Sequence, residues 1–378
     1  MNVPEYLAKQ LLRDGGIATP QGYVARDAAS AEEAARTLGG RVAIKAQIAA
    51  GKRGKSGGVV FADNPGEAHE KAAAMLGATI AGKRVDALLV EAASEIEREL
   101  YAAILNDTSS GSPMVLFSYE GGIDIEELGA RAPERIVRRN VDIRKGLSKS
   151  EACEIGGDER IAGVLQQMYA RFMQLDCELL EINPLVLERS GSVVALDCKM
   201  TIDDSSRPRQ RAIFELVEST VGPQGTPLEL RARDAGLYFI ELDGDVGVLA
   251  NGAGLTMTTL DAIAMRGGRP ANFLEIGGEA YTKATAALEI VLANPRVRSV
   301  LVNFCGAFAR TDVMAEGVVA AYEALRPTGP FFFSIHGTGE EQAIALVRQR
   351  LGIEPLGLMD DAVSAAIEAA REPLGKSA

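Results

Sequence analysis

The chain has 378 residues, of which 47% are hydrophobic and 24% charged, as expected for a globular protein of roughly two or three domains. Its formal net charge of −12 argues against nucleic acid or an anionic membrane as a general partner. No apolar run reaches the roughly 18 residues of a membrane span, and the N-terminal segment is amphipathic, so we expect a cytoplasmic protein. The four cysteines are widely spaced and match no metal-ligand pattern, which predicts reduced thiols.

The first half of the chain predicts helices and strands in alternation. Helices are expected over 4–15, after a capping pattern at Ser30 and Glu33, from Asn64 onward, and over 161–175. Strands are expected over 42–46, 87–91, 100–105 and 114–118. The charged stretch 124–158 predicts helix and loop.

A strand in this half carries an internal lysine, and a glycine-rich basic loop follows it. Lys45 lies within the apolar strand 42–46, where a buried ammonium group requires an anionic partner such as a nucleotide phosphate. The loop 51–58 combines glycines with Lys52, Arg53 and Lys55, a composition that suits phosphate, although it matches no standard nucleotide motif. A strand-edge lysine that reaches solvent and a flexible basic loop are the alternatives.

Residues 179–186 and 193–197 predict a β-hairpin with unexpected polar side chains. Glu181 and Asn183 are two positions apart, so they project from the same face of their strand. Asp197 ends the partner strand. Carboxylate and amide oxygens converging on one hairpin suit Mg²⁺, whereas an ordinary hairpin would turn the same side chains to solvent.

The composition changes over 201–234, which reads as a connection between two domains, 1–234 and 235–378. Beyond it, strands and helices alternate as in a parallel doubly wound sheet, which binds ligands at the carboxyl ends of its strands. Strands are expected over 246–250, 271–276, 299–304, 331–335 and 354–358. Helices are expected over 258–265, 280–292, 313–325, 340–350 and 361–371.

Small-residue turns follow several of these strands. Asn251 opens one such turn at the start of a helix, and residues 303–310 form another, which ends at Arg310. Backbone N–H groups at a helix start can bind a carboxylate. Tight connections also need small residues, so each turn alone is weak evidence for a binding site. Together, the turns favour a ligand-binding site at this edge of the sheet.

Taken together, the segments resemble the β subunit of succinate–CoA ligase and its relatives, which include malate–CoA ligase. The resemblance covers nearly the whole chain. It rests on residues 5–11, Lys45 with 51–58, 90–93, 181–186, 196–197 and 251–255. It implies an N-terminal ATP-grasp domain followed by a flavodoxin-like domain. It also implies a separate α subunit, which binds CoA and carries a histidine that ATP phosphorylates.

The resemblance further implies roles for individual residues. Lys45, Lys52, Arg53 and Gly54 match triphosphate contacts. The resemblance implies further nucleotide contacts at Glu91, Ser94 and Glu99, where Ser94 replaces a more usual threonine. It implies Mg²⁺ ligands at Asn183 and Asp197. Glu181 matches the carboxylate that supports the partner's histidine. Residues Asn251, Gly306, Ala307, Phe308 and Ala309 match positions that bind the acid substrate. Pro20 is similar to the residue found in ADP-forming members.

Departures from the family pattern concern the acid. Ala307 replaces a glycine whose backbone approaches the carboxylate, and Ser334 stands where the family usually has arginine. These changes suggest a CoA ligase whose acid is not succinate. Two other functions remain open: an ATP-grasp ligase that joins a carboxylate to an amine, and a non-catalytic nucleotide-sensing subunit, against which Lys45, Asn183 and Asp197 argue.

Overall fold

The computed structural model describes residues 1–48, 56–276 and 280–371. Two compact units divide between Gly222 and Pro223. The division lies before the expected boundary at residue 234 because helix α8 (Pro227–Asp234) buries Ala232 in the core of the second unit. None of the described helices has both the length and the apolar character needed to cross a membrane. All four cysteines are free thiols, as predicted.

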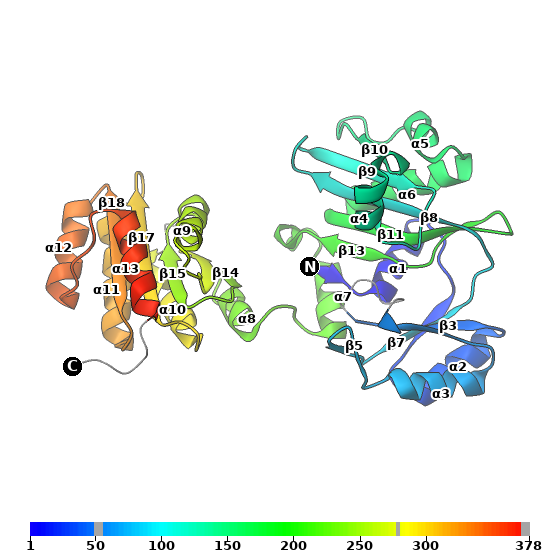
Figure 1. Cartoon of the computed structure of the whole chain (residues 1–378), viewed down its shortest axis with the longest axis horizontal. Coiled ribbons are helices and arrows are strands. Elements are labelled where there is room, and N and C mark those ends of the chain that lie inside the picture. The colour runs from blue at the N-terminus through cyan, green and yellow to red at the C-terminus, as the bar shows by residue number, and fades with distance from the viewer. Residues whose placement is uncertain (49–55, 277–279, 372–378) are drawn as a thin grey trace. The chain divides into compact units, whose positions relative to one another are not determined.

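The first unit contains a large antiparallel sheet in the order β1-β13-β11-β8-β9-β10, with β12 paired to β11 (Figure 1). The strands are β1 (Asn2–Val3), β8 (Ile96–Asp107), β9 (Ser112–Ser118), β10 (Val137–Asn140), β11 (Cys177–Glu188), β12 (Val193–Ala195) and β13 (Lys199–Ile202). The helices of this part are α1 (Glu5–Asp14), α4 (Ile125–Arg131), α5 (Lys149–Gly156), α6 (Glu159–Gln174) and α7 (Arg211–Val221). Short 3₁₀ turns occupy Pro133–Arg135 and Asp204–Ser206.

The second sheet of this unit is smaller and has the order β2-β7-β3-β4. Its strands are β2 (Gly22–Ala25), β3 (Val42–Ala46), β4 (Val59–Ala62) and β7 (Leu88–Ala92), and the pair β5 (Thr79–Ile80) and β6 (Lys83–Arg84) lies beside it. Helices α2 (Ala28–Leu38) and α3 (Pro65–Met75) cover one face. The capping residue of α2 is Asp27, with Ser30 as its reciprocal partner, so the expected Ser30–Glu33 box is wrong.

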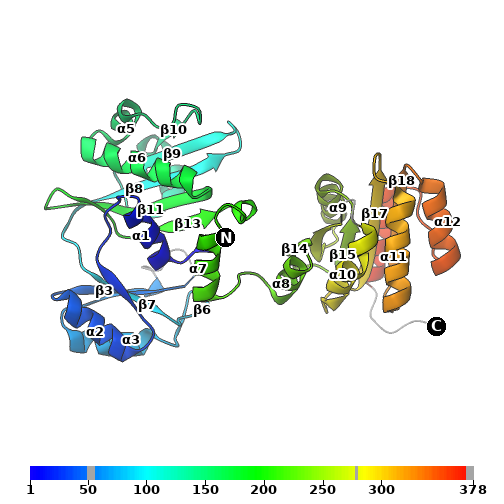
Figure 2. The same cartoon turned by 180° about the vertical axis from the view of Figure 1, so that it is seen from behind.

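Helix α1 lies between the two sheets (Figure 2). It follows β1, which pairs with β13 of the large sheet, and it packs Leu7, Ala8 and Leu12 into the core of that sheet. The same helix turns Glu5 and Lys9 toward β3 and β7 of the small sheet. The first unit is therefore joined across its two sheets by one short helix.

The expected connection over 201–234 is wrong in part, because it contains ordered elements. Strand β13 runs to Ile202, and helices α7 and α8 follow. Phe214 and Val217 of α7 are buried in the core of the large sheet, which accounts for their helical spacing. Only the stretch between Gly222 and Thr226 connects the two units without regular structure.

The second unit has a sheet in the order β14-β16-β15-β17-β18. Its strands are β14 (Tyr238–Glu241), β15 (Val246–Ala250), β16 (Asn272–Glu275), β17 (Ser299–Gly306) and β18 (Phe331–Gly337). Helices α9 (Ala253–Met265) and α13 (Met359–Arg371) cover one face, and α10 (Ala280–Ala293), α11 (Thr311–Leu325) and α12 (Glu340–Leu351) cover the other. The predicted doubly wound arrangement is confirmed.

One strand of this sheet was expected in the wrong place. The segment 354–358 makes only an isolated bridge, between Ser334 and Leu356. The outer position on the opposite side is taken by β14, which runs antiparallel to β16. The sequence analysis did not predict β14, which is short and has one buried residue, Phe239. Tyr238 and Ile240 on either side of it are exposed, as in an edge strand.

Candidate functional site

Lys45 lies in a buried cluster of charged side chains. Its ammonium Nζ is 2.8 Å from Glu91 Oε2 and 3.7 Å from Glu5 Oε1, and it also donates to the carbonyl of Leu196. Lys9 Nζ lies 2.7 Å from both carboxylate oxygens of Glu91. Lys45 therefore has the anionic partner that its position in a strand requires, and the chain itself supplies it.

The carboxylates around Lys45 determine its charge. Burial by itself lowers the pKa of Lys45, but Glu5, Glu91 and Asp197 together hold it above its ordinary value. Lys45 is therefore a cation at every physiological pH. Its side chain is 12% exposed, whereas that of Lys9 is 1% exposed, so Lys45 is the member of the pair that can reach a ligand.

Glu91 is a buried carboxylate near the end of β7. It is 1% exposed, and its carboxylate accepts from both lysines. The side chain also borders a hollow of about 170 Å³, together with Lys9, Gly22 and Leu89. Ser94 follows β7 in a half-buried loop. The triphosphate contacts expected at Lys52, Arg53 and Gly54 lie outside the described residues.

Asn183 and Glu99 approach the same loop from neighbouring strands. Asn183 Oδ1 accepts from the N–H of Gly122 at 2.8 Å, and its Nδ2 donates to the carbonyl of Ile123 at 2.9 Å. A Cβ atom on Gly122 would lie 2.0 Å from Glu99 Oε2, so glycine is required there for the carboxylate to come this close. These contacts fix the orientation of the Asn183 amide.

Asp197 acts electrostatically on both Lys45 and Glu181. It follows β12 in the short turn before β13, and its Oδ1 accepts from the N–H of Cys198 at 2.8 Å. Burial raises the pKa of Glu181, Asp197 and Glu126 raise it further, and Lys199 opposes them. Lys45, Asp197 and Glu181 thus form one electrostatically connected array.

Asn183 and Asp197 fit a magnesium ion that a nucleotide brings with it. Within the described ranges, no group of three or more His, Cys, Asp or Glu side chains could hold a metal by itself. Asn183 Oδ1 keeps a second lone pair beside the one that Gly122 uses, and Asp197 supplies a carboxylate. Mg²⁺ is commonly held by one or two protein oxygens, with phosphate and water completing its octahedron.

The expected acid-binding residues meet at the carboxyl edge of the second unit's sheet. The side-chain amide of Asn251 pairs with the backbone of Cys305, donating to its carbonyl at 2.9 Å and accepting from its N–H at 2.8 Å. Gly306 is buried, and a Cβ atom there would lie 2.2 Å from the carbonyl oxygen of Ala309. Asn251 therefore shapes the loop 306–309 by holding its start.

Thr338 holds the same loop from the other side. Its hydroxyl donates to the carbonyl of Ala307 at 2.9 Å, and its N–H donates to the carbonyl of Gly306 at 2.8 Å. Phe308 is fully exposed at the tip of the loop. Arg310 makes a bidentate pair with Asp312, and the hydroxyl of Ser334 is buried without a hydrogen-bond partner.

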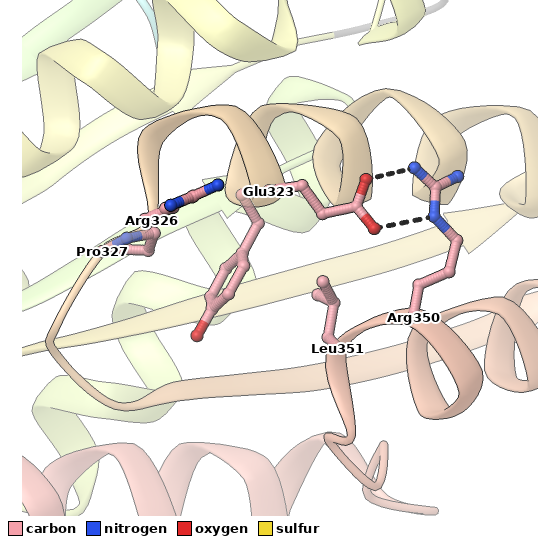
Figure 3. Close-up of a pocket in the computed structure, with 6 residues that line it drawn as sticks. Glu323, Arg326, Pro327, Arg350 and Leu351 are labelled. Atoms are coloured by element: carbon pink, nitrogen blue, oxygen red, sulfur yellow. Dashed lines mark hydrogen bonds and ion pairs between the residues drawn. The ribbon is translucent and has the colours of Figure 1, made fainter.

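A hollow of about 380 Å³ lies at the opposite edge of this sheet (Figure 3). It is lined by Tyr322, Glu323, Arg326, Pro327, Arg350 and Leu351. The guanidinium of Arg350 is paired with Glu323 (Figure 3). It also pairs with Glu316. Helices α11 and α12 end here, at the amino ends of the parallel strands, whereas doubly wound sheets bind ligands at the carboxyl ends. We therefore place no function in this hollow.

Sequence reasoning missed Lys9 and Glu5 as site residues. The available signal was their spacing: they lie four positions apart on one face of α1, and that face is otherwise apolar, with Ala8 and Leu12. A charged pair on the buried stripe of a helix needs charged partners elsewhere in the fold.

Two family models match the chain: an ATP-grasp domain model over residues 2–187 and a CoA-ligase model over residues 249–368. The chain also resembles the solved structure of ATP citrate lyase from Methanothrix soehngenii in complex with citrate and coenzyme A. That match has a TM-score of 0.72 at 21% identity and covers 97% of this chain and 99% of the other. The predicted ATP-grasp domain followed by a doubly wound domain is confirmed.

Relatives with higher identity match along the whole chain. The ADP-forming succinate–CoA ligase β subunit of Rubrobacter xylanophilus is 42% identical, over 98% of this chain and 99% of its own length. The GDP-forming succinate–CoA ligase β subunit of Thermus thermophilus is 41% identical, over 92% of this chain and 93% of its own length. This chain therefore belongs to the succinate–CoA ligase β-subunit family of acid–CoA ligases.

Proposed function

We propose that this chain is the nucleotide-binding β subunit of an acid–CoA ligase that uses ATP and Mg²⁺. The observation that carries the proposal is the array of Lys45, Asp197 and Glu181 in the ATP-grasp unit, where Lys45 pairs with Glu91 and donates to the carbonyl of Leu196, the residue before Asp197. The partner is an α subunit that binds CoA and carries the histidine to be phosphorylated. The relatives are named as β subunits, which supports a heteromer.

Each residue of the array has a proposed task. Lys45 donates to a phosphate of ATP and stabilises the charge that moves during transfer. Asn183 and Asp197 hold Mg²⁺, which neutralises charge on the phosphates when bound. Glu181, whose pKa burial raises, accepts a hydrogen bond from the partner's histidine and orients its ring. Other proposed nucleotide contacts are Glu91, Ser94 and Glu99, and the proposed triphosphate contacts besides Lys45 are Lys52, Arg53 and Gly54.

The reaction proceeds in three balanced steps. A ring nitrogen of the partner's histidine attacks the γ-phosphorus, and the bond from that phosphorus to ADP breaks. A carboxylate oxygen of the acid then takes the phosphoryl group, which gives an acyl phosphate and a free histidine. Finally, the thiolate of CoA attacks the acyl carbon and displaces phosphate. Because the phosphorylated histidine belongs to the partner, this chain cannot complete the cycle alone.

We further propose that the acid is not succinate. The acid binds at the loop that Asn251 and Thr338 hold in place. The proposed contacts are Asn251, Gly306, Ala307, Phe308 and Ala309. Ala307 adds a Cβ atom where the family usually has glycine. Arg310 is already paired with Asp312, and the uncharged Ser334 stands in place of an arginine, so these two positions offer a second carboxylate no free cation.

The test is reconstitution with an α-like chain encoded beside this one. The purified heteromer is incubated with labelled ATP or GTP, and then with CoA and a panel of acids. We expect Mg²⁺-dependent labelling of the partner's histidine from ATP, and acyl-CoA formation with an acid other than succinate. No labelling from either nucleotide contradicts the ligase proposal, and efficient succinate turnover contradicts only the choice of acid.

The alternative of a carboxylate–amine ligase has less support, because residues 249–368 match a CoA-ligase model. A non-catalytic sensing role would require binding of ATP without transfer. In the same reconstitution, bound nucleotide together with an unlabelled histidine would identify such a subunit.

A further inference from the structure

Lys9 is a buried lysine whose donors are all used within the chain. Its Nζ contacts Glu91 Oε1 and Oε2 at 2.7 Å each, the carbonyl of Leu196 at 2.7 Å and Glu5 Oε1 at 3.0 Å. An ammonium group has three N–H donors, and Lys9 is 1% exposed. Lys9 therefore cannot contact a nucleotide, and any effect on one must act through its partners.

Those partners belong to the proposed nucleotide site. Glu91 pairs with Lys9 and with Lys45, and Glu5 lies near both lysines. The four side chains of this cluster are those of Lys9, Lys45, Glu5 and Glu91, and their charges sum to zero. Without Lys9, both carboxylates would act on Lys45 alone, and the cluster would carry a net negative charge beside the place proposed for the triphosphate.

The carbonyl of Leu196 connects the same cluster to the proposed metal ligands. It accepts from both Lys9 and Lys45, and Leu196 immediately precedes Asp197. The N–H of Leu196 donates to the carbonyl of Pro184 at 3.1 Å, and Pro184 immediately follows Asn183. The two lysines therefore hold the backbone that carries Asn183 and Asp197.

Helix α1 gives Lys9 a fixed place from which to act. The helix is anchored to the large sheet through β1 and through buried Leu12, whereas Lys45 and Glu91 belong to strands of the small sheet. Lys9 thus ties β7 of the small sheet to the Leu196 turn of the large sheet. Residues that orient ligating or binding side chains in this way commonly change affinity by roughly 10- to 100-fold when they are replaced.

We propose that Lys9 is a positioning residue of the nucleotide site: it neutralises Glu91 and holds the Leu196 carbonyl, so that Lys45 and Asp197 remain directed at Mg·ATP. This inference rests on the proposed function. Lys9 touches neither nucleotide nor metal. Its contribution is to the charge of the cluster and to the alignment of the two sheets at the site.

The test measures Mg·ATP binding to the full chain by calorimetry for wild type and three variants. Lys9→Met removes the charge and keeps an apolar stem, so the cluster becomes negative and the dissociation constant is expected to rise roughly 10-fold or more. Glu5→Gln makes the cluster positive and is expected to tighten binding by roughly threefold. The double variant is neutral again and is expected to bind close to wild type.

Two measurements separate this role from a purely structural one. Lys71→Met removes a partly exposed lysine of α3 that pairs with Glu67, and it should leave Mg·ATP binding unchanged. Melting temperatures show whether each variant is folded at the temperature of the titration. If Lys9→Met does not fold, the Mg·ATP affinities of Glu5→Gln, wild type and the double variant still test the role of Lys9. The double variant is expected to fold, because removing both partners leaves no unpaired buried charge.

The outcomes are distinct. Wild type that does not bind Mg·ATP contradicts the proposed function itself. Wild-type binding with an unchanged affinity in folded Lys9→Met overturns only the role of Lys9. Equal weakening in the single and double variants also overturns it, because the charge of the cluster would then not matter.

Discussion

Single residues in this protein take their properties from neighbours that are distant in sequence. Lys45 alone has the features of a phosphate ligand, but its first partners are Glu91, Glu5 and the carbonyl of Leu196. Glu181 lies in a strand, half-buried, with Asp197 and Glu126 close enough to raise its pKa beyond the effect of burial. The charge state of each group therefore follows from the assembled site.

At this scale, Glu181→Gln is expected to stabilise the nucleotide-free chain at pH 8. Because the folded-state pKa of Glu181 is raised, its ionised form opposes folding above that pKa. The cost disappears below the ordinary glutamate pKa of about 4.3, where the carboxyl group is protonated in both states. The melting temperature of the variant should therefore exceed that of wild type by a few degrees at pH 8, and the two should converge as the pH falls toward 4.

Glu178→Gln is the matched control, because Glu178 is exposed on the same strand. Substitutions of such surface residues usually change stability by less than about 0.5 kcal/mol. A gain for Glu178→Gln equal to that for Glu181→Gln would show that lowering the net negative charge, and not burial of Glu181, is the cause.

Among the elements, the end of β18 shows how backbone geometry shapes the proposed acid site. Gly337 has a φ of +98°, and a Cβ atom there would lie 2.0 Å from the carbonyl oxygen of Gly306. That carbonyl accepts from the N–H of Thr338, whose hydroxyl holds Ala307. The close approach of β17 and β18 therefore depends on a residue without a side chain.

Gly337→Ala is expected to destabilise the second unit by about 2–4 kcal/mol, because the strained φ and the steric overlap add together. Gly352→Ala separates the two causes: Gly352 also has a positive φ, of +69°, but nothing lies within 4 Å of the added Cβ. Its expected cost is about 1 kcal/mol. Denaturant unfolding measures both, and equal losses would argue against the close approach at Gly337.

At the scale of the whole molecule, the chain forms two units with separate cores. The division lies between Gly222 and Pro223, so α8 belongs to the second unit. Ala232 of α8 is fully buried there, and Glu229 accepts from the N–H of Glu241 in β14 at 3.0 Å. A boundary at residue 234, as the composition of 201–234 suggests, would remove these contacts from the second unit.

Two fragments test this assignment. Residues 223–378 are expected to fold cooperatively, whereas residues 235–378 should be less stable by about 2 kcal/mol or more, since they leave the site of Ala232 and Leu228 uncovered. Thermal unfolding by circular dichroism compares the two. Identical melting temperatures would show that α8 contributes nothing to the second unit.

The sequence alone determined the order of most elements, the two-domain arrangement and the residues that carry the family resemblance. Helix caps such as Asn64, apolar periodicity over α6, and short apolar strands act locally, so they can be read from neighbouring residues. The motifs identified the family because they are collinear along nearly the whole chain, which the 42% identity to a relative confirms.

Only the tertiary structure decided what surrounds the key side chains. Lys9 and Glu91 are separated by 82 positions, and Lys9 and Leu196 by 187, yet they meet at 2.7 Å. No local pattern encodes such a meeting, because it depends on how α1 packs between two sheets. For the same reason, the edge strand β14 and the role of Asn251 in holding Cys305 were not predicted. Local propensity selects elements, whereas burial and charge pairing across elements decide the site.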